Sequence, residues 1–374
     1  MGSLLCCAAF EACSGACCLG KCLCRGISTS KKCSNYIYLV IFVMTTLLSL
    51  VIQQWAAPDF DIYSFDNSCV NVTDVDTCKG DSAVYRVSSG LALWFTILAL
   101  SNICSTRFHS DFWGLKSILL IVLVGGLFFV PGFGNEGYVN TARILSSLFL
   151  VSQLVSFVDA AYNWDDSIEE KNTLWDVLIV VAVLGLWTII VLLYVHYSGC
   201  TIGTVFITVS ILLIVGTIAL QLNIGPFFEK DDERPGSALS TTIVAMYSVY
   251  LCWSAVTANP DTCNPTHLEN TPILWGMFLT ACSIGWNSYS IGKAYPEDDE
   301  DEEGVDYSLI YFHAVMAVGS LYMAMLLTNW GTVSGNQSAV KMWVSISSQW
   351  VSILIYIWTL IAPACCKNRG FNEL

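Results

Sequence analysis

The chain has 374 residues, of which 55% are hydrophobic and only 12% are charged, and its formal net charge at pH 7 is −14. Soluble proteins carry about 25% charged residues, so the composition predicts a membrane protein, and the acidic balance argues against nucleic acid as a partner. Apolar runs of about 20 residues recur along the chain, as crossing a hydrocarbon core of about 30 Å requires. We expect an all-α integral membrane protein, because the alternating strands of roughly ten residues that form membrane barrels are absent.

The N-terminal tail, residues 1–36, is rich in cysteine and precedes the first long apolar run. Its basic residues follow its first apolar stretch instead of preceding it, so we expect an uncleaved signal anchor in the first span and no cleaved signal peptide. Cysteines beside a membrane are commonly S-acylated, and we favour this interpretation over a metal site, because no further ligand pair follows at zinc-finger spacing. A short extra membrane helix is the alternative for this tail. The acylation candidates are Cys6, Cys7, Cys17 and Cys18.

Ten apolar runs between residues 37 and 362 are predicted to form transmembrane helices, followed by a short tail, 363–374. An even number of spans places both termini on one side, and the distribution of Lys and Arg predicts that this side is cytoplasmic. Glycosylation acceptor patterns at Asn71 and Asn336 fall in the outside loops of this topology. The expected spans are 37–54, 84–105, 115–130, 141–162, 174–197, 202–224, 239–258, 272–292, 308–328 and 342–362.

Four cysteines fall in predicted outside loops, on the oxidising side of the membrane where disulfides persist. Cys69 and Cys78 share the first outside loop, and Cys200 and Cys263 lie in two later ones. We expect a disulfide within each of these two pairs, with free thiols as the alternative.

Two predicted cytoplasmic loops are acidic, residues 229–234 and 297–303. A block of like charge is usually a solvated loop, and this is the interpretation that we favour. A docking surface for a basic partner is the alternative.

No soluble-type catalytic or nucleotide-binding motif is present, so we expect no enzyme activity, no metal and no cofactor. Ionisable residues inside spans are costly and therefore functional candidates, and Arg143, Asp159 and His313 lie deepest. Arg143 and Asp159 are sixteen residues apart on one predicted helix, about 24 Å, and cannot pair with each other. The alternatives are snorkelling side chains for these two, and a hydrogen-bonded core histidine for His313.

Patterned segments occur over nearly the whole chain. They include His109-Ser110-Asp111-Phe112-Trp113, Phe157-Val158-Asp159-Ala160-Ala161-Tyr162-Asn163-Trp164, Tyr250-Leu251-Cys252-Trp253-Ser254-Ala255, Phe312-His313 and Leu327-Thr328-Asn329-Trp330. With these segments in this order, the chain resembles the serine incorporator (Serinc) family, also called the TDE or TMS family. The resemblance implies two helical bundles crossed by a long diagonal helix, for which residues 140–164 are the candidate. One departure is the loop 292–306, which is far shorter than the long cytoplasmic loop of familiar animal members.

The resemblance further implies a role in phosphatidylserine and sphingolipid metabolism, with energy-independent phospholipid transport between leaflets through a polar groove. Arg143, Asp159 and His313 are the residues that we expect in this groove. Phospholipids are the expected partners, with sterol, sphingolipid and lipid-synthesis enzymes as further candidates, and the sequence leaves a homo-oligomer open. The expected location is the endoplasmic reticulum, the Golgi or the plasma membrane. A scaffold for serine-using lipid synthases and a secondary transporter of serine or another small solute are the alternative functions.

Overall fold

The computed structural model describes residues 31–56, 69, 75–131, 133, 136–167, 173–223, 237–265, 271–293, 306–331 and 339–365. Every regular element in these ranges is a helix, which confirms the all-α prediction, and a helix lies at each of the ten predicted positions. Several predicted features lie outside the described residues. They are the acylation candidates Cys6, Cys7, Cys17 and Cys18, the acceptors Asn71 and Asn336, and the two acidic loops.

Eight of the described helices are long and apolar enough to cross a membrane. Two of the ten predicted spans are not among these eight helices. α6 (Trp113–Leu127) has 15 residues, or about 22 Å, and α11 (Thr271–Lys293) is not among the eight. Buried polar residues such as Thr280 and Asn287 lower the apolar character of α11.

The chain divides into two compact helical units, as the two expected bundles require. Unit 1 comprises residues 1–149 and 276–337, and unit 2 comprises residues 150–275 and 338–374. The long helix predicted around 140–164 is α7 (Glu136–Ser167), whose 32 residues extend about 48 Å and belong partly to each unit.

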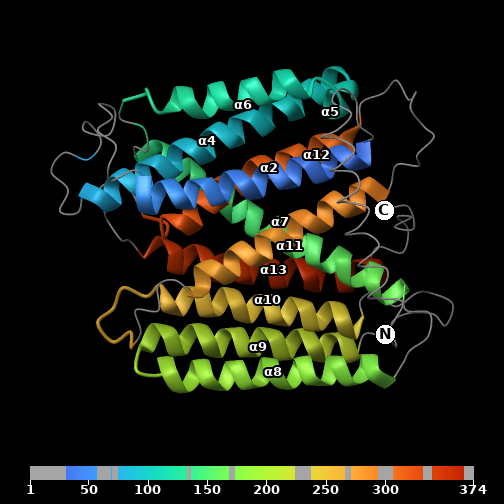
Figure 1. The fold of residues 1–374 in the computed structure, drawn as a ribbon. Coiled ribbons are helices and arrows are strands. Elements are labelled where there is room, and N and C mark those ends of the chain that lie inside the picture. The colour runs from blue at the N-terminus through green and yellow to red at the C-terminus, as the bar shows by residue number, and fades with distance from the viewer. Residues whose placement is uncertain are drawn as a thin grey trace. The chain divides into compact units, whose positions relative to one another are not determined.

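In unit 1, α4 (Val75–Cys104) packs against α2 (Lys31–Val51), α6 and α12 (Tyr307–Leu327). Figure 1 shows α2, α4 and α12 running alongside one another. A glycine permits a close approach of α4 to α6, since a Cβ at Gly90 would lie 2.7 Å from Val124 Cγ2. The unit also contains η1 (Ile52–Ala56), α5 (Arg107–Ser110), and the parts of α7 and α11 assigned to it.

In unit 2, α8 (Thr173–Tyr197), α9 (Thr201–Asn223) and α10 (Ala238–Thr257) lie side by side, as Figure 1 shows. α13 (Val340–Cys365) packs against α9 and α10. Their shared core is aliphatic and aromatic, and includes Leu186, Ile190, Phe206, Ile214, Met342 and Ile346.

Local sequence explains where two of the helices begin. The Asp306 carboxylate accepts hydrogen bonds from the backbone amides of Ser308 and Leu309 at the start of α12. Ser237 and Ser240 form a reciprocal capping box at the start of α10. Both devices satisfy amides that the first turn of a helix leaves without intrahelical partners.

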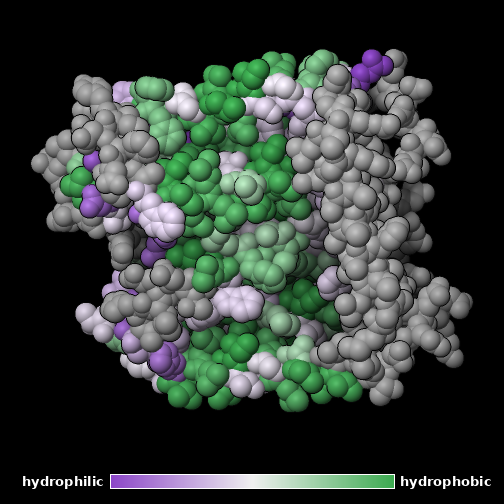
Figure 2. All heavy atoms as spheres, viewed as in Figure 1, coloured by the Kyte–Doolittle hydropathy of each residue, from purple (hydrophilic) through white to green (hydrophobic). Residues whose placement is uncertain are grey.

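The outward faces of the helices are apolar, as a membrane protein requires. On α8, Leu184, Leu192 and Val195 are more than half exposed, and on α6 Leu115, Ile118 and Ile121 are similarly exposed. Figure 2 shows hydrophobic side chains covering the visible faces of the described helices. Water would penalise such surfaces and lipid would not, so the described fold is that of a multi-pass membrane protein.

Both predicted disulfides form in the structure, one within each unit. Cys69 and Cys78 have Cα atoms 5.9 Å apart in unit 1, and Cys200 and Cys263 have Cα atoms 5.4 Å apart in unit 2. These separations are ordinary for disulfides. The first bridge ties the segment before α4 to its first turn, and the second ties the α8–α9 connection to the segment after α10.

Candidate functional site

The structure places the three predicted intramembrane residues apart. Arg143 is half-buried on the unit 1 part of α7, and His313 is fully buried on α12 of the same unit. Asp159 lies exposed on the unit 2 part of α7, where its carboxylate accepts a hydrogen bond from Asn163 Nδ2 at 3.3 Å. Each of the three residues is therefore described within its own unit.

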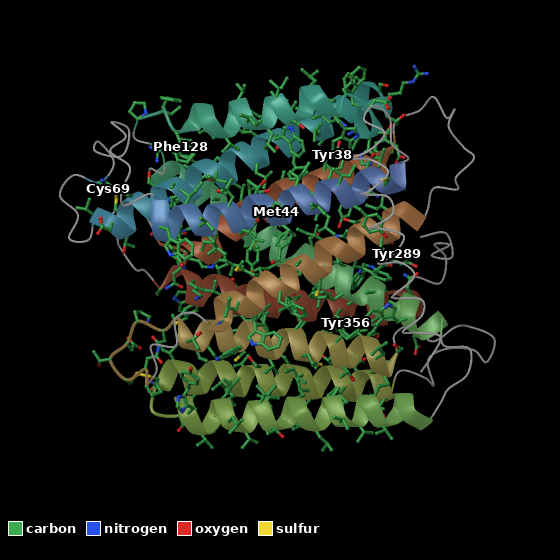
Figure 3. The ribbon with its side chains drawn as sticks, viewed as in Figure 1. Tyr38, Met44, Cys69, Phe128, Tyr289 and Tyr356 are labelled. Atoms are coloured by element: carbon green, nitrogen blue, oxygen red, sulfur yellow. A yellow bond between two sulfur atoms is a disulfide. The ribbon has the colours of Figure 1, made fainter. Side chains whose placement is uncertain are left out.

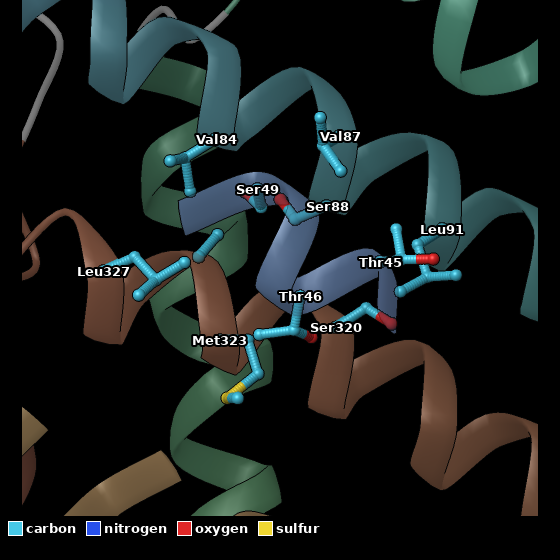
Figure 4. Close-up of a pocket in the computed structure, with 11 residues that line it drawn as sticks. Thr45, Thr46, Ser49, Val84, Val87, Ser88, Leu91, Ser320, Met323 and Leu327 are labelled. Atoms are coloured by element: carbon cyan, nitrogen blue, oxygen red, sulfur yellow. The ribbon is translucent and has the colours of Figure 1, made fainter. Parts of the chain in front are cut away.

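A narrow crevice lies between α2, α4 and α12 of unit 1, with a cavity volume of about 10 Å³. Five hydroxyl side chains line it together with aliphatic groups, and Figure 4 shows the hydroxyls of Ser49 and Ser88 on facing helices. Ligand pockets for drug-sized molecules usually measure about 300–1,000 Å³, so in this conformation the crevice has room for about one water molecule and not for a lipid headgroup. The lining residues are Thr45, Thr46, Ser49, Val84, Val87, Ser88, Leu91, Ser320, Met323, Ala324 and Leu327.

Hydroxyl groups in the crevice retain the capacity to accept hydrogen bonds. Thr46 and Ser320 each donate to the carbonyl four residues earlier, at 2.8 Å, and Ser88 donates to the Tyr85 carbonyl at 3.2 Å. Such bonds use the hydroxyl proton and leave lone pairs for another donor. Ser49 is 4% exposed, and its Oγ has no hydrogen-bond partner in the described part of the chain.

Arg143 lies beside a tightly bonded turn that follows α12. Its guanidinium donates from Nη2 to the Trp330 carbonyl at 2.7 Å and from Nη1 to Asn140 Oδ1 at 3.0 Å. Tyr85 of α4 donates to the Gly331 carbonyl at 2.6 Å. The turn is strained, because Asn329 and Trp330 have positive φ angles of 50° and 60°, which non-glycine residues rarely adopt. Arg143 is thus held by neutral partners, and its charge remains available to an anion.

Sequence reasoning missed Arg86, which is 0% exposed on α4. Its guanidinium donates to the carbonyls of Leu127 at 3.1 Å and Val130 at 3.2 Å, and also to the Ser82 carbonyl and hydroxyl. The cation thus lies at the C-terminal end of α6, where the helix dipole favours positive charge. The position of Arg86 inside the predicted span 84–105 was the feature that could have marked it.

A second cluster that sequence reasoning missed surrounds His313. We call it the histidine hub and define it as Tyr38, Trp94, His109, Lys116 and His313. His109 Nδ1 and His313 Nε2 are 3.1 Å apart, and Lys116 Nζ donates to the Tyr38 hydroxyl at 2.8 Å and the His109 carbonyl at 2.9 Å. Figure 3 labels Tyr38 on α2 among these helices. Lys116 lies inside the predicted span 115–130, and its side chain is 4% exposed. A lone lysine in this apolar run was the available indication.

The described residues contain no cluster of side chains suited to bind a metal ion. No group of three or more His, Cys, Asp or Glu side chains there could hold a metal ion. The hub contributes only two imidazoles, which is fewer ligands than structural or catalytic zinc sites use.

The fold and its polar features define a multi-pass, all-α membrane protein whose unit 1 contains a hydroxyl-lined crevice and the buried cations Arg86 and Lys116. The family model described as Serine incorporator (Serinc) matches residues 5–295 and 290–369. The chain belongs to the serine incorporator family, as the sequence resemblance implied.

Named relatives align over most of this chain. Serine incorporator 3 from Bos taurus is 27% identical, with 96% of each chain aligned. A probable serine incorporator from Nematostella vectensis is 31% identical, over 79% of this chain and 82% of the relative. A probable serine incorporator from Dictyostelium discoideum is 26% identical, over 92% of this chain and 97% of the relative.

Proposed function

We propose that this serine incorporator family member moves phospholipids, including phosphatidylserine, between leaflets without an energy source. In this proposal α2, α4 and α12 separate enough for the headgroup to travel along the crevice between them, while the acyl chains stay in the surrounding lipid. Transport of this kind would supply phosphatidylserine and sphingolipid metabolism and requires no chemical step by the protein. The observation that carries the proposal is the row of buried hydroxyls in the crevice, with the unpartnered Ser49 Oγ among them.

The physical reason is the cost of taking a polar headgroup into hydrocarbon. Burying one polar group without a hydrogen-bond partner costs roughly 2–7 kcal/mol. Hydroxyls from three helices can exchange hydrogen bonds with the headgroup as it passes. The Arg143 guanidinium, bound only to neutral partners, offers charge-assisted bonds to the phosphate at the crevice end where α12 terminates.

The names of the relatives mention serine. Proteins named serine incorporators resemble this chain over nearly its full length. A serine-containing headgroup is therefore the first one to test, and phosphatidylcholine serves as the comparison lipid.

The test is lipid flipping in proteoliposomes. Vesicles carrying a fluorescent phosphatidylserine reporter are treated with dithionite, which quenches only the outer leaflet. We expect quenching beyond the outer-leaflet fraction in vesicles with protein and none beyond it in protein-free vesicles. Loss of one charge-assisted bond costs about 1.5–3 kcal/mol, so Arg143→Gln is expected to slow flipping about tenfold or more. Ser49→Leu, which fills the crevice, is expected to slow it similarly.

Two controls make this test specific to the crevice. Thr188→Leu changes an exposed hydroxyl on α8 that has the same bond to the carbonyl four residues earlier, at 2.8 Å, and should leave the rate unchanged. Thr217→Leu alters a similar crevice, also of about 10 Å³, between α9, α10 and α13 in unit 2. If Thr217→Leu slows flipping and Ser49→Leu does not, the proposed route is wrong. If folded wild-type protein gives no excess quenching, transport itself is refuted and a scaffold for lipid synthases becomes the better hypothesis.

A further inference from the structure

The histidine hub joins elements that are far apart in sequence. Tyr38 comes from α2, Trp94 from α4, His109 from α5, Lys116 from α6 and His313 from α12. Besides the bonds given above, Trp94 Nε1 donates to the Lys116 carbonyl at 2.9 Å, and the Tyr38 hydroxyl donates to the His109 carbonyl at 2.9 Å. A change of charge in the hub therefore acts on five elements at once.

One of the ring nitrogen atoms in this histidine pair lacks a hydrogen-bond partner in the described residues. One proton lies between His109 Nδ1 and His313 Nε2, because one nitrogen must donate and the other accept. His313 is 0% exposed, and its Nδ1 has no hydrogen-bond partner in the described residues. When His313 Nε2 is the donor, Nδ1 presents a free lone pair inside the protein. That atom is where an added proton would bind.

The groups around this lone pair determine what an added proton would do. Lys116 and His109 are the titratable groups that act electrostatically on His313, and Asp111 acts on Lys116. The other rings that face His313 are Phe95 and Phe312, which carry no charge, and Tyr38. Lys116 Nζ itself is bonded to two neutral oxygen atoms and lies 4.3 Å from the centre of the Trp113 ring. A protonated His313 would thus add a second positive charge beside Lys116 in a buried cluster, and both burial and this neighbouring cation disfavour the added proton.

A strained backbone conformation lies close in sequence to His109 and Lys116 of the hub. Phe112, directly before α6, has a φ of 61°, a left-handed conformation that costs a non-glycine residue about 1–2 kcal/mol. Its carbonyl accepts the Lys116 amide at 3.0 Å. Strain of this kind persists only while the surrounding contacts hold it, so weakening the hub favours release of this turn.

We propose that the His109–His313 pair is a proton-binding site, and that binding one proton there loosens the packing of α5 and the start of α6 against α2 and α12 within unit 1. The proton comes from water and binds His313 Nδ1, while His313 Nε2 continues to donate to His109 Nδ1. No other bond forms or breaks. The imidazolium then repels Lys116, and the bonds from Lys116 to Tyr38 and to the His109 carbonyl weaken. The site does not depend on lipid transport.

A direct test uses the wild-type protein in liposomes. The chain has only four histidines, so ¹⁵N-histidine labelling gives a spectrum that can be assigned residue by residue. Solid-state NMR between about pH 8 and pH 4 reports the protonation of each ring. The range extends below the one in which exposed imidazoles titrate, because burial and Lys116 disfavour the added proton. We expect the His109 and His313 signals to change together in one step. If both rings stay neutral over the whole range, or if they titrate independently of each other, the proposal is overturned.

The structural consequence is tested by hydrogen exchange. After correction for intrinsic rates, protection of amides 107–116 is expected to fall as the pH falls, by up to about tenfold per pH unit for one linked proton. His313→Gln should remove this dependence, whereas His196→Gln, which changes an exposed histidine on α8, should keep it. Equal pH profiles for wild type and His313→Gln would overturn the proposal. If His313→Gln does not fold, the NMR titration decides alone.

Discussion

Replacing Arg86 with methionine is expected to destabilise unit 1 specifically at the end of α6. The guanidinium supplies bonds to the carbonyls of Leu127 and Val130, which belong to the last residues of α6 and the turn beyond it. Leu127 keeps a second partner, since its carbonyl also accepts the Val130 amide at 3.2 Å. The Val130 carbonyl loses its guanidinium donor, and lipid offers no replacement.

The size of the effect follows from these contacts. A hydrogen bond from a charged group contributes about 1.5–3 kcal/mol, and two such bonds reach the end of α6. Removing the buried charge returns part of this energy, and Leu127 remains bonded, so we expect a loss of about 3 kcal/mol. That loss corresponds to a fall of about 6–12 °C in the thermal midpoint. Arg86→Lys keeps the charge but loses the forked geometry, and should lie between wild type and Arg86→Met.

The assay is thermal unfolding in detergent, combined with hydrogen exchange of residues 125–131. Arg107→Met is the matched control, because Arg107 is exposed on α5 in the same unit. Equal midpoints for Arg86→Met and Arg107→Met would refute the reasoning. So would a loss of protection in unit 2 as large as that at the end of α6.

Two further comparisons test the packing and the covalent links. Gly90→Ala should destabilise by about 1–3 kcal/mol, because the new Cβ would lie 2.7 Å from Val124 Cγ2, whereas Gly125→Ala has no atom within 4 Å and should be neutral or stabilising by up to about 1 kcal/mol. Thermal midpoints of the two variants measure this difference, and equal values would contradict the close approach of α4 and α6. Replacing Cys200 and Cys263 by serine should cost about 4 kcal/mol, against about 3 kcal/mol for Cys69 and Cys78, because the bridges close sequence separations of 63 and 9 residues. Midpoints measured without reductant test the order, and a larger loss for the Cys69–Cys78 pair would contradict it.

Helix positions were predictable because the length of an apolar run is a local property. The span predicted at 174–197 is the helix Thr173–Tyr197, and the span predicted at 202–224 is Thr201–Asn223. The start of the first span was harder to predict. The predicted span begins at residue 37, whereas α2 begins at Lys31, and its polar residues Ser34 and Asn35 are buried. Asn35 donates to the Ser288 carbonyl, 253 residues away, and hydropathy along the chain contains no information about such a partner.

The polar site could be predicted only in part, for the same reason. Arg143 was identified because a cation inside an apolar run is unusual. Lys116 and Arg86 also lie inside predicted spans but were not selected, because their partners come from other segments. Lys116 bonds to Tyr38, 78 residues away, and Arg86 bonds to Val130, 44 residues away. The hydroxyls of the crevice were missed as a group because Thr46, Ser88 and Ser320 lie on three different helices.

The polar contacts at both ends of α6 explain why this short helix has a defined position at all. Lipid is as apolar as the outward face of α6, so hydrophobicity alone does little to fix it against α4. Arg86 binds carbonyls at its C-terminal end, and the hub binds Lys116 at its N-terminal end. If the hub takes up a proton as proposed, only the N-terminal contact weakens, and Arg86 still holds the other end. Loss of protection should therefore be confined to residues 107–116 and should not reach 125–131, which separates a tilt of α6 from its detachment.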